Sequence, residues 1–450
     1  MKTTEQNSAS QSSVAAHGAA PVRSKSKPKG RVVKAHWQRA LLSFLMVVGP
    51  GLIVTTADND AGAVSTYTQA GAIYGTHLMW ILLLLLPTTY FVQEMVARLG
   101  IATGQGHAAM IYQRFGKWWG VFSLCDLLLV NFLTLVTEFA GISLAVHELG
   151  ISPIIAVPLA ALTLVALVST GSYRRWERIT IILCLLNVAW FYLAWASHPA
   201  AGSVIHHLAV PNLPPGGMNS TLMFMIIGIV GTTIAPWQLF FQQSCVADKK
   251  LRFADLPWAR LDTFLGACLT VAVAGCMMMI GDLTFRHHIP FTDPAQMAHA
   301  LGIIANPTFK RWFLILMIDA SILGATTISL ASSWAYGEVK GWTHSLDRKV
   351  SDAKGFYAVY LTCVGAAAAL VLIPHAPLQL IIVSVQVLAG VMLPSAIIFL
   401  QLLLNDRELL GDDWVNKPWN NWVNWTIIVI LFILSLALAL QVVLPNLFPS

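Results

Sequence analysis

The chain has 450 residues, of which 56% are hydrophobic and only 11% are charged, and its mean hydropathy is +0.68. Soluble proteins contain about 25% charged residues, so this composition excludes a soluble globular protein and indicates a polytopic membrane protein. The apolar runs are continuous and reach the ~20 residues that a helix needs to cross a bilayer, whereas a transmembrane barrel requires alternating segments. We therefore expect an all-α membrane protein with one large helical domain.

Residues 1–37 differ from the rest of the chain because they are polar, basic and low in complexity. No apolar stretch begins before Leu41, so this segment lacks the apolar core of a cleaved signal peptide. We expect a disordered cytoplasmic tail whose basic residues contact membrane lipid and do not bind nucleic acid.

Eleven apolar segments are predicted to form membrane helices, and two of these are interrupted. Glycine and proline mark the joints, as at 199–217 and 374–377. The predicted helices span about 40–72 (interrupted), 76–98, 118–147, 152–170, 177–197, 219–246 (interrupted), 258–283, 309–340, 354–373, 377–404 and 422–446.

Lysine and arginine are distributed unequally between the two sets of joints. With the N-terminus inside, all but three of the 27 fall on the inside, and the exceptions are Arg286, Lys310 and Arg311. The positive-inside rule predicts this bias. We therefore expect a bacterial-type cytoplasmic membrane, with the N-terminus inside and the C-terminus outside. Glu94 and Arg98 stand four residues apart near an inner helix end, so they are expected to form an ion pair.

The two interrupted helices are the first and the sixth, five helices apart. An odd number of helices places the two halves in opposite orientations. Inverted five-helix repeats with a broken first helix define the LeuT-type transporter fold, in which the substrate binds at mid-membrane. We predict this fold with eleven transmembrane helices. Its predicted parts are the tail (1–37), the first repeat (38–205), the second repeat (206–408) and an additional helix 11 (409–450).

The first interruption carries two acids, Asp58 and Asp60, inside an apolar segment. A charged side chain at that depth costs about 2.5–3.5 kcal/mol, so such residues persist where they face a cavity, a partner or an ion. Asp60 is the primary candidate for a cation ligand, and a carbonyl freed near Ala57 is a second. Asp58 and Asn59 are candidate cavity-lining residues. In the alternative interpretation, the acids cap the second half-helix by accepting backbone N–H groups.

The sixth helix is interrupted by Pro236. Because proline has no N–H group, the carbonyl of Thr232, four residues earlier, loses its helical partner and becomes a candidate ligand. Thr233, Trp237 and Gln238 are candidate cavity-lining residues. The alternatives are an ordinary proline kink and, for the glutamine, a hydrogen bond between helices.

Two stretches around the interruptions, GPGLIVTTADNDAG (49–62) and GTTIAPWQLFFQQS (231–244), resemble the first- and sixth-helix motifs of the Nramp superfamily of divalent-metal transporters. Order and spacing agree over about residues 40–410. The resemblance implies the LeuT-type fold and a secondary transporter of divalent cations. Further matches are Ala97–Gly100 with Thr103–Gly104, Thr137–Glu138, Asp262–Thr263, Gln386 before Leu393–Pro394, and Asn405–Arg407 with Leu410–Gly411.

Two departures from the family motifs bear on the choice of ion. The resemblance places Asp60 on the metal-binding aspartate, Ala63 on an asparagine and Ala235 on a methionine, and this pattern is similar to the Nramp-related magnesium transporters. A thioether favours transition metals, whereas Mg²⁺ prefers few carboxylates and several retained waters. The two alanines therefore favour a partly hydrated Mg²⁺, with Mn²⁺ as a second substrate. Gln386 matches a family position near the metal, and an interhelical hydrogen bond is its alternative role.

The resemblance also implies transport without proton coupling. Trp237 and either Gln242 or Gln243 stand where proton-coupled members have histidines, and Gly141 stands where a second acid is expected. Glu138 remains a candidate for a proton or gating network. Its alternative is a structural pairing with an arginine at a helix end.

We therefore expect an uncoupled importer of Mg²⁺ and Mn²⁺ that acts as a monomer, without a cofactor and without enzymatic activity. The open alternatives are a proton-coupled carrier of Mn²⁺, Fe²⁺ or other transition metals, an amino-acid or Na⁺-coupled symporter on the same fold, and a membrane enzyme or channel. Ca²⁺ is not excluded, because it also takes oxygen ligands. Asp262 and Asp319 are expected in gating or packing networks and not among the ligands.

Overall fold

The structure is a computed structural model that describes residues 47–443, except 215–216 and 413. The predicted tail and the beginning of the first predicted helix lie outside these residues. Within them the chain is almost entirely helical and contains no strand, as the composition predicts.

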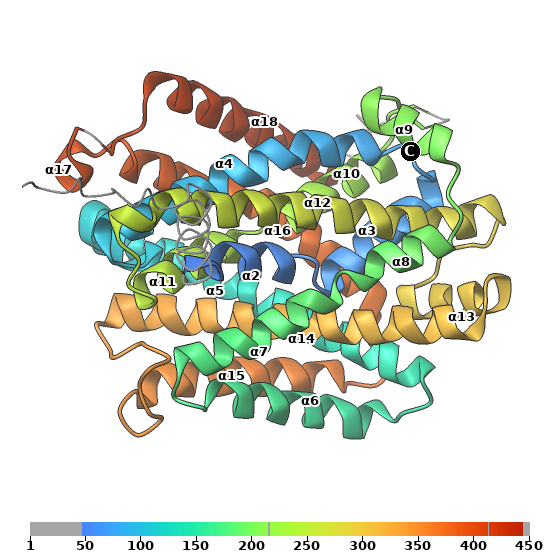
Figure 1. The fold of residues 1–450 in the computed structure, drawn as a ribbon, viewed down its shortest axis with the longest axis horizontal. Helices are drawn as coiled ribbons and strands as arrows, with labels where there is room; N and C mark the ends of the chain where they lie inside the picture. Colours follow the sequence, from blue (N-terminus) through green and yellow to red (C-terminus); the bar gives the residue numbers. More distant parts are fainter. Residues whose placement is uncertain (1–46, 215–216, 413, 444–450) are drawn as a thin grey trace, which may run out of the picture. The chain divides into compact units, whose positions relative to one another are not determined.

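The helices follow the predicted order, and both predicted interruptions are present (Figure 1). The interrupted first helix is α2 (Pro50–Ala57) with α3 (Ala61–Tyr74), and the interrupted sixth is α10 (Ser220–Thr233) with α11 (Pro236–Asp248). The other predicted spans are α4 (Met79–Thr103), α5 (His107–Glu148), α6 (Pro153–Val168), α7 (Tyr173–Leu186) with α8 (Ala189–Ala196), α12 (Leu256–Arg286), α14 (Pro307–Lys340), α15 (Lys354–Val371), α16 (Leu378–Leu403) and α18 (Pro418–Val443).

In the described part of the chain, nine of these spans are long and apolar enough to cross a membrane. The shorter α6 and the broken α2–α3 segment bring the set to the eleven that were predicted. The LeuT-type helical architecture is thus present with both of its characteristic breaks.

Some boundaries differ from the prediction. The third predicted helix, from about 118, is preceded by a helical segment that begins at His107 and was not predicted. Gly116, with φ of 84° and ψ of 176°, makes the sharp bend between the two parts of α5. The fifth predicted helix is divided into α7 and α8 at residues 187–188. Four short elements were not predicted: α9 (Ala201–Ala209), η1 (Phe253–Asp255), α13 (Pro294–Ile304) and α17 (Arg407–Leu410).

Capping explains one of the short helices that the apolar pattern misses. Asp293 precedes α13, and its carboxylate accepts the N–H groups of Ala295 and Gln296 at 2.9 Å. Pro294 occupies the first helical position, where its missing N–H costs nothing. Such caps are visible in the sequence, whereas a search for long apolar runs passes over an eleven-residue helix.

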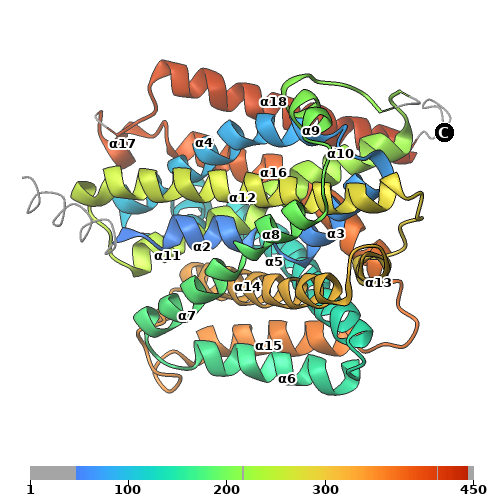
Figure 2. The same ribbon diagram turned by 45° about the vertical axis from the view of Figure 1, so that its right-hand side comes forward.

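The two interrupted helices lie in the interior of the bundle. α3 packs against α12 and α10, α10 against α16, and α14 against α5. α6 and α15 lie side by side at one edge, and α18 lies at the opposite edge (Figures 1 and 2). The apolar windows of the α10–α11 span and of α14 are each 83% buried, whereas that of α18 is 17% buried. The unwound segments are therefore surrounded by protein.

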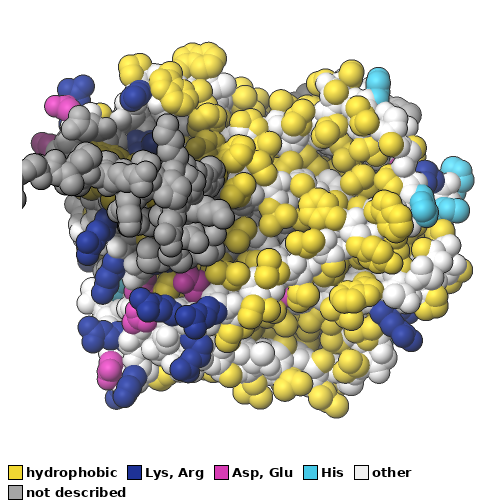
Figure 3. Space-filling model, in the orientation of Figure 1, with side chains coloured by type: hydrophobic (Ala, Val, Ile, Leu, Met, Phe, Trp, Pro, Cys, Tyr) yellow, Lys and Arg dark blue, Asp and Glu magenta, His cyan; other side chains and the backbone are white. Residues whose placement is uncertain are grey.

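Charged side chains gather at the ends of the helices. On the face shown in Figure 3, most lysines and arginines lie toward one end, and histidines lie toward the other. The expected ion pair between Glu94 and Arg98 is confirmed, with 3.3 Å between Arg98 Nε and Glu94 Oε1. The distribution agrees with the unequal division of lysine and arginine between the joints.

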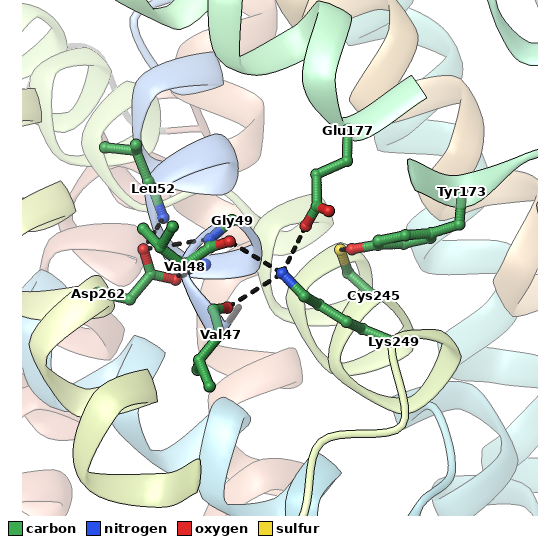
Figure 4. Close-up of polar contacts among 10 residues, drawn as sticks. Val47, Val48, Gly49, Leu52, Tyr173, Glu177, Cys245, Lys249 and Asp262 are labelled. Atoms are coloured by element: carbon green, nitrogen blue, oxygen red, sulfur yellow. Dashed lines mark hydrogen bonds and ion pairs between the residues drawn. The ribbon is translucent and has the colours of Figure 1, made fainter. Parts of the chain in front are cut away.

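The first half-helix, α2, is fixed at its beginning by a carboxylate from α12 (Figure 4). Asp262 accepts the N–H groups of Gly51 at 2.7 Å and Leu52 at 3.2 Å, and that of Gly49 at 3.3 Å. A carboxylate at this position satisfies N–H groups that have no partner inside the helix and interacts favourably with the helix dipole.

Lys249, the residue that follows α11, binds the backbone just before α2. Lys249 Nζ donates to the carbonyls of Val47 at 3.1 Å and Val48 at 2.8 Å, and it pairs with Glu177 of α7 at 2.6 Å (Figure 4). These contacts join the beginning of α2 to α7, α11 and α12. The position of the first interruption therefore depends on three other helices.

We expect Asp262→Asn to loosen α2. The neutral amide keeps one acceptor oxygen but loses the other and the negative charge, and such a charge at a helix N-terminus is worth about 0.3–1 kcal/mol, and up to about 2 kcal/mol when partly buried. Amide hydrogen exchange within 51–57 should accelerate by about 2- to 30-fold. Asp293→Asn, which weakens the equivalent cap of α13, is the matched control and should leave exchange in α2 unchanged. Equal protection of α2 in both variants would contradict the role of Asp262.

Candidate functional site

The first interruption separates α2 from α3 at residues 58–60. Asp60 is extended, with φ of −75° and ψ of −172°, and its Oδ1 accepts the N–H of Ala63 at 2.8 Å. The N–H of Ala61 would bond the carbonyl of Ala57 in a continuous helix, but it donates to Glu138 Oε2 at 3.1 Å. The carbonyl of Ala57 has thus lost its helical partner.

Asp60 therefore caps α3 with one oxygen, as the alternative interpretation predicted for this residue. This contact does not use the full acceptor capacity of a carboxylate, which has about four lone-pair positions. Asp60 is 3% exposed, and the Glu138 carboxyl group lies beside it. Capping and cation binding are thus compatible functions of one side chain.

The second interruption separates α10 from α11 at Ile234 and Ala235, both of which are extended. Pro236 begins α11, so no N–H group is available four residues after Thr232, whose hydroxyl also has no hydrogen-bond partner. Thr233 Oγ1 lies 2.7 Å from the hydroxyl of Tyr67 on α3. This contact joins the second interruption to the helix that follows the first.

Gln386 of α16 lies where the two interruptions approach each other. A Cβ atom added to Gly62 would overlap the Gln386 side-chain amide, and one added to Gly231 would overlap the Gln386 backbone. Only glycine allows both approaches, because it has no Cβ atom. Gln386 is 1% exposed, and its Nε2 has no hydrogen-bond partner. The three predicted elements of the site, in α2–α3, α10–α11 and α16, thus converge.

The candidate lining residues lie around the same point. The Asp58 carboxylate accepts a hydrogen bond from Gln238 Nε2, and Gln238 Oε1 accepts one from Gln93 at 2.6 Å. Asn59 is completely buried, with both amide atoms unpaired. The Trp237 indole N–H is also unpaired, and its ring packs against Phe241, with centroids 6.1 Å apart.

Among the described residues Glu138 pairs with no arginine, and its contact is the N–H of Ala61, so the predicted pairing at a helix end is not present there. Glu138 lies in the last third of α5, where it accepts the N–H of Ala61 that the break between α2 and α3 exposes. Its second oxygen, Oε1, is buried and unpaired. No Lys, Arg or His between residues 47 and 443 forms an ion pair with Asp58, Asp60 or Glu138.

Unpaired buried polar atoms are concentrated here. Each such atom costs about 1–3 kcal/mol when it has no partner, and native proteins leave few of them. This site therefore requires water or a bound ion to complete it. The atoms are Asp58 Oδ2, Asn59 Oδ1 and Nδ2, Glu138 Oε1, Thr232 Oγ1 and Gln386 Nε2.

The acids do not form a metal site by themselves. No group of three or more His, Cys, Asp or Glu side chains in the described residues is arranged to hold a metal ion. A cation held here would take much of its coordination from carbonyl and amide oxygens and from water. Hard divalent ions such as Mg²⁺ and Ca²⁺ accept this ligand set.

Gly141 occupies the position where a second acid was expected from the family pattern. A Cβ atom there would lie 2.5 Å from Ala61 Cβ and 2.7 Å from Ser321 Oγ. Hence α5 contacts the beginning of α3 directly, and no side chain fits between them.

Gln242 and Gln243 do not join the site. Gln242 Nε2 donates to Thr263 at 3.2 Å, and Gln243 Oε1 lies 2.9 Å from His107 Nδ1. Both form hydrogen bonds between helices. Gln93, which links to Asp58 through Gln238, was not predicted, and its only signal in the sequence is an amide within an apolar span.

This chain is similar to known proteins over most of its length. The family model described as "Natural resistance-associated macrophage protein-like" (Nramp) matches residues 51–441. The divalent metal cation transporter MntH of Staphylococcus aureus (strain JH9) is 24% identical over 426 residues, which are 88% of this chain and 91% of that protein.

Solved structures share the fold. A manganese transporter of Eremococcus coleocola superposes with a TM-score of 0.76 at 20% identity, covering 90% of this chain and 89% of that one. MhsT, solved with L-phenylalanine, superposes with a TM-score of 0.51 at 14% identity, covering 87% and 98%. The fold is therefore common to proteins with different ligands, and only the site distinguishes between them.

We expect Gly231→Ala to destabilise the protein by about 1–3 kcal/mol, the usual cost of overpacking, because the new methyl group overlaps the backbone of α16. Gly228→Ala, one turn earlier in α10, is the matched control. Its methyl group would meet only Val387 Cγ2 at 3.4 Å and Thr66 Cγ2 at 3.6 Å. Thermal unfolding in detergent measures the difference, and equal stability of the two variants would show that α10 and α16 are not in close contact.

Proposed function

The chain belongs to the Nramp family, and from this we propose that it is a membrane transporter that carries divalent metal cations, with Mg²⁺ as the main substrate and Mn²⁺ as the second. The observation that carries the proposal is the cluster of unpaired buried polar atoms around Asp60, where two helix breaks and Gln386 converge. The family consists of membrane transporters, in agreement with the expectation that the chain is not an enzyme.

Asp60 is the principal ligand in this proposal. The backbone carbonyls of Ala57 and Thr232 supply further oxygen atoms, because neither has its helical partner. The Gln386 side chain contributes directly or through water. With one carboxylate and several neutral oxygens, the site suits a hard cation that keeps part of its hydration shell.

Two alanines support Mg²⁺ as the main substrate. Ala63 and Ala235 are 0% and 3% exposed, and their methyl groups offer no donor atom to a metal. The related motifs carry an asparagine and a methionine at these positions. Without a thioether the site loses its preference for transition metals, and the smaller side chains leave volume for water.

We further propose that transport is driven by the membrane potential without protons. Trp237 occupies a position where related transporters have a histidine, and its indole does not titrate. The potential provides about 2.3 kcal/mol per charge per 100 mV, and twice that for a divalent ion. Because the potential of a cytoplasmic membrane is negative inside, this force favours the entry of a cation. The basic N-terminal segment favours a cytoplasmic N-terminus, and we propose that the monomer is the transporting unit.

One observation favours the alternative, a proton-coupled carrier of transition metals. Glu138 is completely buried beside Asp60, and no cation pairs with it in the part of the chain that the structure describes. A buried acid next to a metal ligand is a suitable proton carrier. Proton movement therefore has to be measured together with ion movement.

Asp60→Ala is expected to abolish uptake of both Mg²⁺ and Mn²⁺ into liposomes, because it removes the principal charged ligand. Asp126→Asn, which alters a half-buried acid of α5 that binds Ser395 at 2.7 Å, is the control and should retain uptake. Undiminished transport by Asp60→Ala would remove Asp60 from the site.

Ala235→Met is expected to shift the preference from Mg²⁺ toward Mn²⁺ and Cd²⁺, since it introduces a soft thioether beside the ion. Ala235→Leu fills a similar volume without sulfur and serves as the matched control. Competition between the ions in the same liposomes measures the shift. An equal change in both variants would attribute the effect to volume and contradict the proposed basis of selectivity.

Proteoliposomes with a fixed potential allow ion entry and internal pH to be recorded together. We expect Mg²⁺ to enter, to compete with Mn²⁺, and to leave the internal pH unchanged. If Mg²⁺ neither enters nor competes, the magnesium proposal is wrong. Acidification in step with metal entry would instead support the proton-coupled alternative.

A further inference from the structure

A cavity of about 600 Å³ lies where the beginnings of α12 and α18 meet α4. It is lined by Glu94, the neighbour of Gln93, and by none of the candidate metal ligands. It contains an unusual combination of cationic and aromatic side chains. Its polar lining includes Glu94, Arg98, Arg260, Lys417 and Asn420.

The polar floor of this cavity has an excess of positive charge. Glu94 Oε1 accepts from Arg260 Nη2 at 2.8 Å and pairs with Arg98 Nε at 3.3 Å, so one carboxylate serves two guanidinium groups. Arg98 is 5% exposed and also donates to the carbonyl of Trp414 at 2.8 Å, which fixes its position. Glu94 is the only acid that lines the cavity among the described residues.

Lys417 and the first turn of α18 add further attraction for an anion. Lys417 is exposed and forms no ion pair or hydrogen bond through its ammonium group with any described residue. α18 begins at Pro418, so the N–H groups of Trp419 and Asn420 have no partner within the helix. A helix beginning with unpaired N–H groups favours an anionic group such as a phosphate.

Two aromatic pairs form the walls. Phe253 and Trp414 have ring centroids 4.1 Å apart, and Phe91 and Trp419 contact edge to face at 5.8 Å. Aromatic side chains of this kind collect at the level of lipid headgroups, where they contact both hydrocarbon and polar groups.

The cavity lies on the lipid-facing side of the bundle. The apolar window of α18 is only 17% buried, and Trp422 and Trp425, which follow Trp419 on this helix, are 73% and 45% exposed. An anion that enters the cavity from this side can leave an apolar chain against α18. A soluble anion, which has no acyl chain, would make no contact with this apolar surface.

We infer that this cavity binds the phosphodiester headgroup of an anionic phospholipid, with Arg260 and Lys417 as its cationic contacts. Arg98 is buried and donates to Trp414 and Asn416, so it adds positive charge beneath the headgroup without contacting it directly. The lipid would join α18 to α4 and α12 at the end of the bundle that carries most lysines and arginines. The inference does not depend on which ion the protein transports.

Native mass spectrometry of the full chain, with phosphatidylglycerol and phosphatidylcholine of identical acyl chains, tests the inference. The protein should retain phosphatidylglycerol preferentially. Lys417→Gln should lower its occupancy about fivefold, the effect of one basic residue at an anionic membrane surface. Lys349→Gln alters an exposed lysine outside this cavity and should change nothing. An equal melting temperature of both variants in phosphatidylcholine alone confirms that Lys417→Gln is folded.

Two results would overturn the inference. The first is that the protein retains phosphatidylglycerol and phosphatidylcholine equally, or that Lys417→Gln and Lys349→Gln bind phosphatidylglycerol with the same occupancy. The second is that the cavity binds free inorganic phosphate and not a lipid headgroup. If inorganic phosphate raises the melting temperature of lipid-depleted protein as much as phosphatidylglycerol does, and Lys417→Gln removes that rise, the ligand is free phosphate and not a lipid.

Discussion

Backbone carbonyl and N–H groups inside a bilayer must find partners within the protein, and the bundle is organised around two places where helices fail to provide them. One lies at residues 58–60 and the other at residues 234–235. Both are surrounded by helices, and each leaves a carbonyl without its helical partner. The unpaired groups then form one polar region. That region explains why Asp58, Asp60 and Glu138 occur in segments that are otherwise apolar.

The surrounding helices hold the two interruptions in place by different means. At the beginning of α2, Asp262 and Lys249 bind N–H and carbonyl groups of the backbone. At the site itself, contact depends on the absence of side chains. Gly62 and Gly231 allow α3 and α10 to approach α16, and a Cβ atom on Gly324 would lie 2.7 Å from Glu138 Oε2 and 2.8 Å from Asp60 Cβ. The region is held by hydrogen bonds at its edges and is closely packed at its centre, but polar atoms at its centre remain unpaired.

The sequence allowed the helices and the two breaks to be predicted, and it pointed to the candidate site residues beside those breaks, because these follow from local chemistry. Pro236 cannot donate an N–H wherever it lies, and acids inside an apolar run mark a polar environment. Contacts between distant segments were not predictable in the same way. Gln93 and Gln238 are 145 positions apart, and Gly51 and Asp262 are 211 apart. No periodicity in a single sequence identifies such partners, so the cap of α2 and the role of Gln93 became visible only in three dimensions.

The central claim is that the two interruptions form one cation site with Asp60 as its charged ligand. Anomalous scattering from crystals grown with Mn²⁺ tests it most directly, because the signal locates the ion independently of the protein atoms. The account predicts one peak between the Asp60 carboxylate and the carbonyl of Thr232, which weakens as Mg²⁺ is added. A peak elsewhere in the bundle, or one that remains in Asp60→Ala, would contradict it.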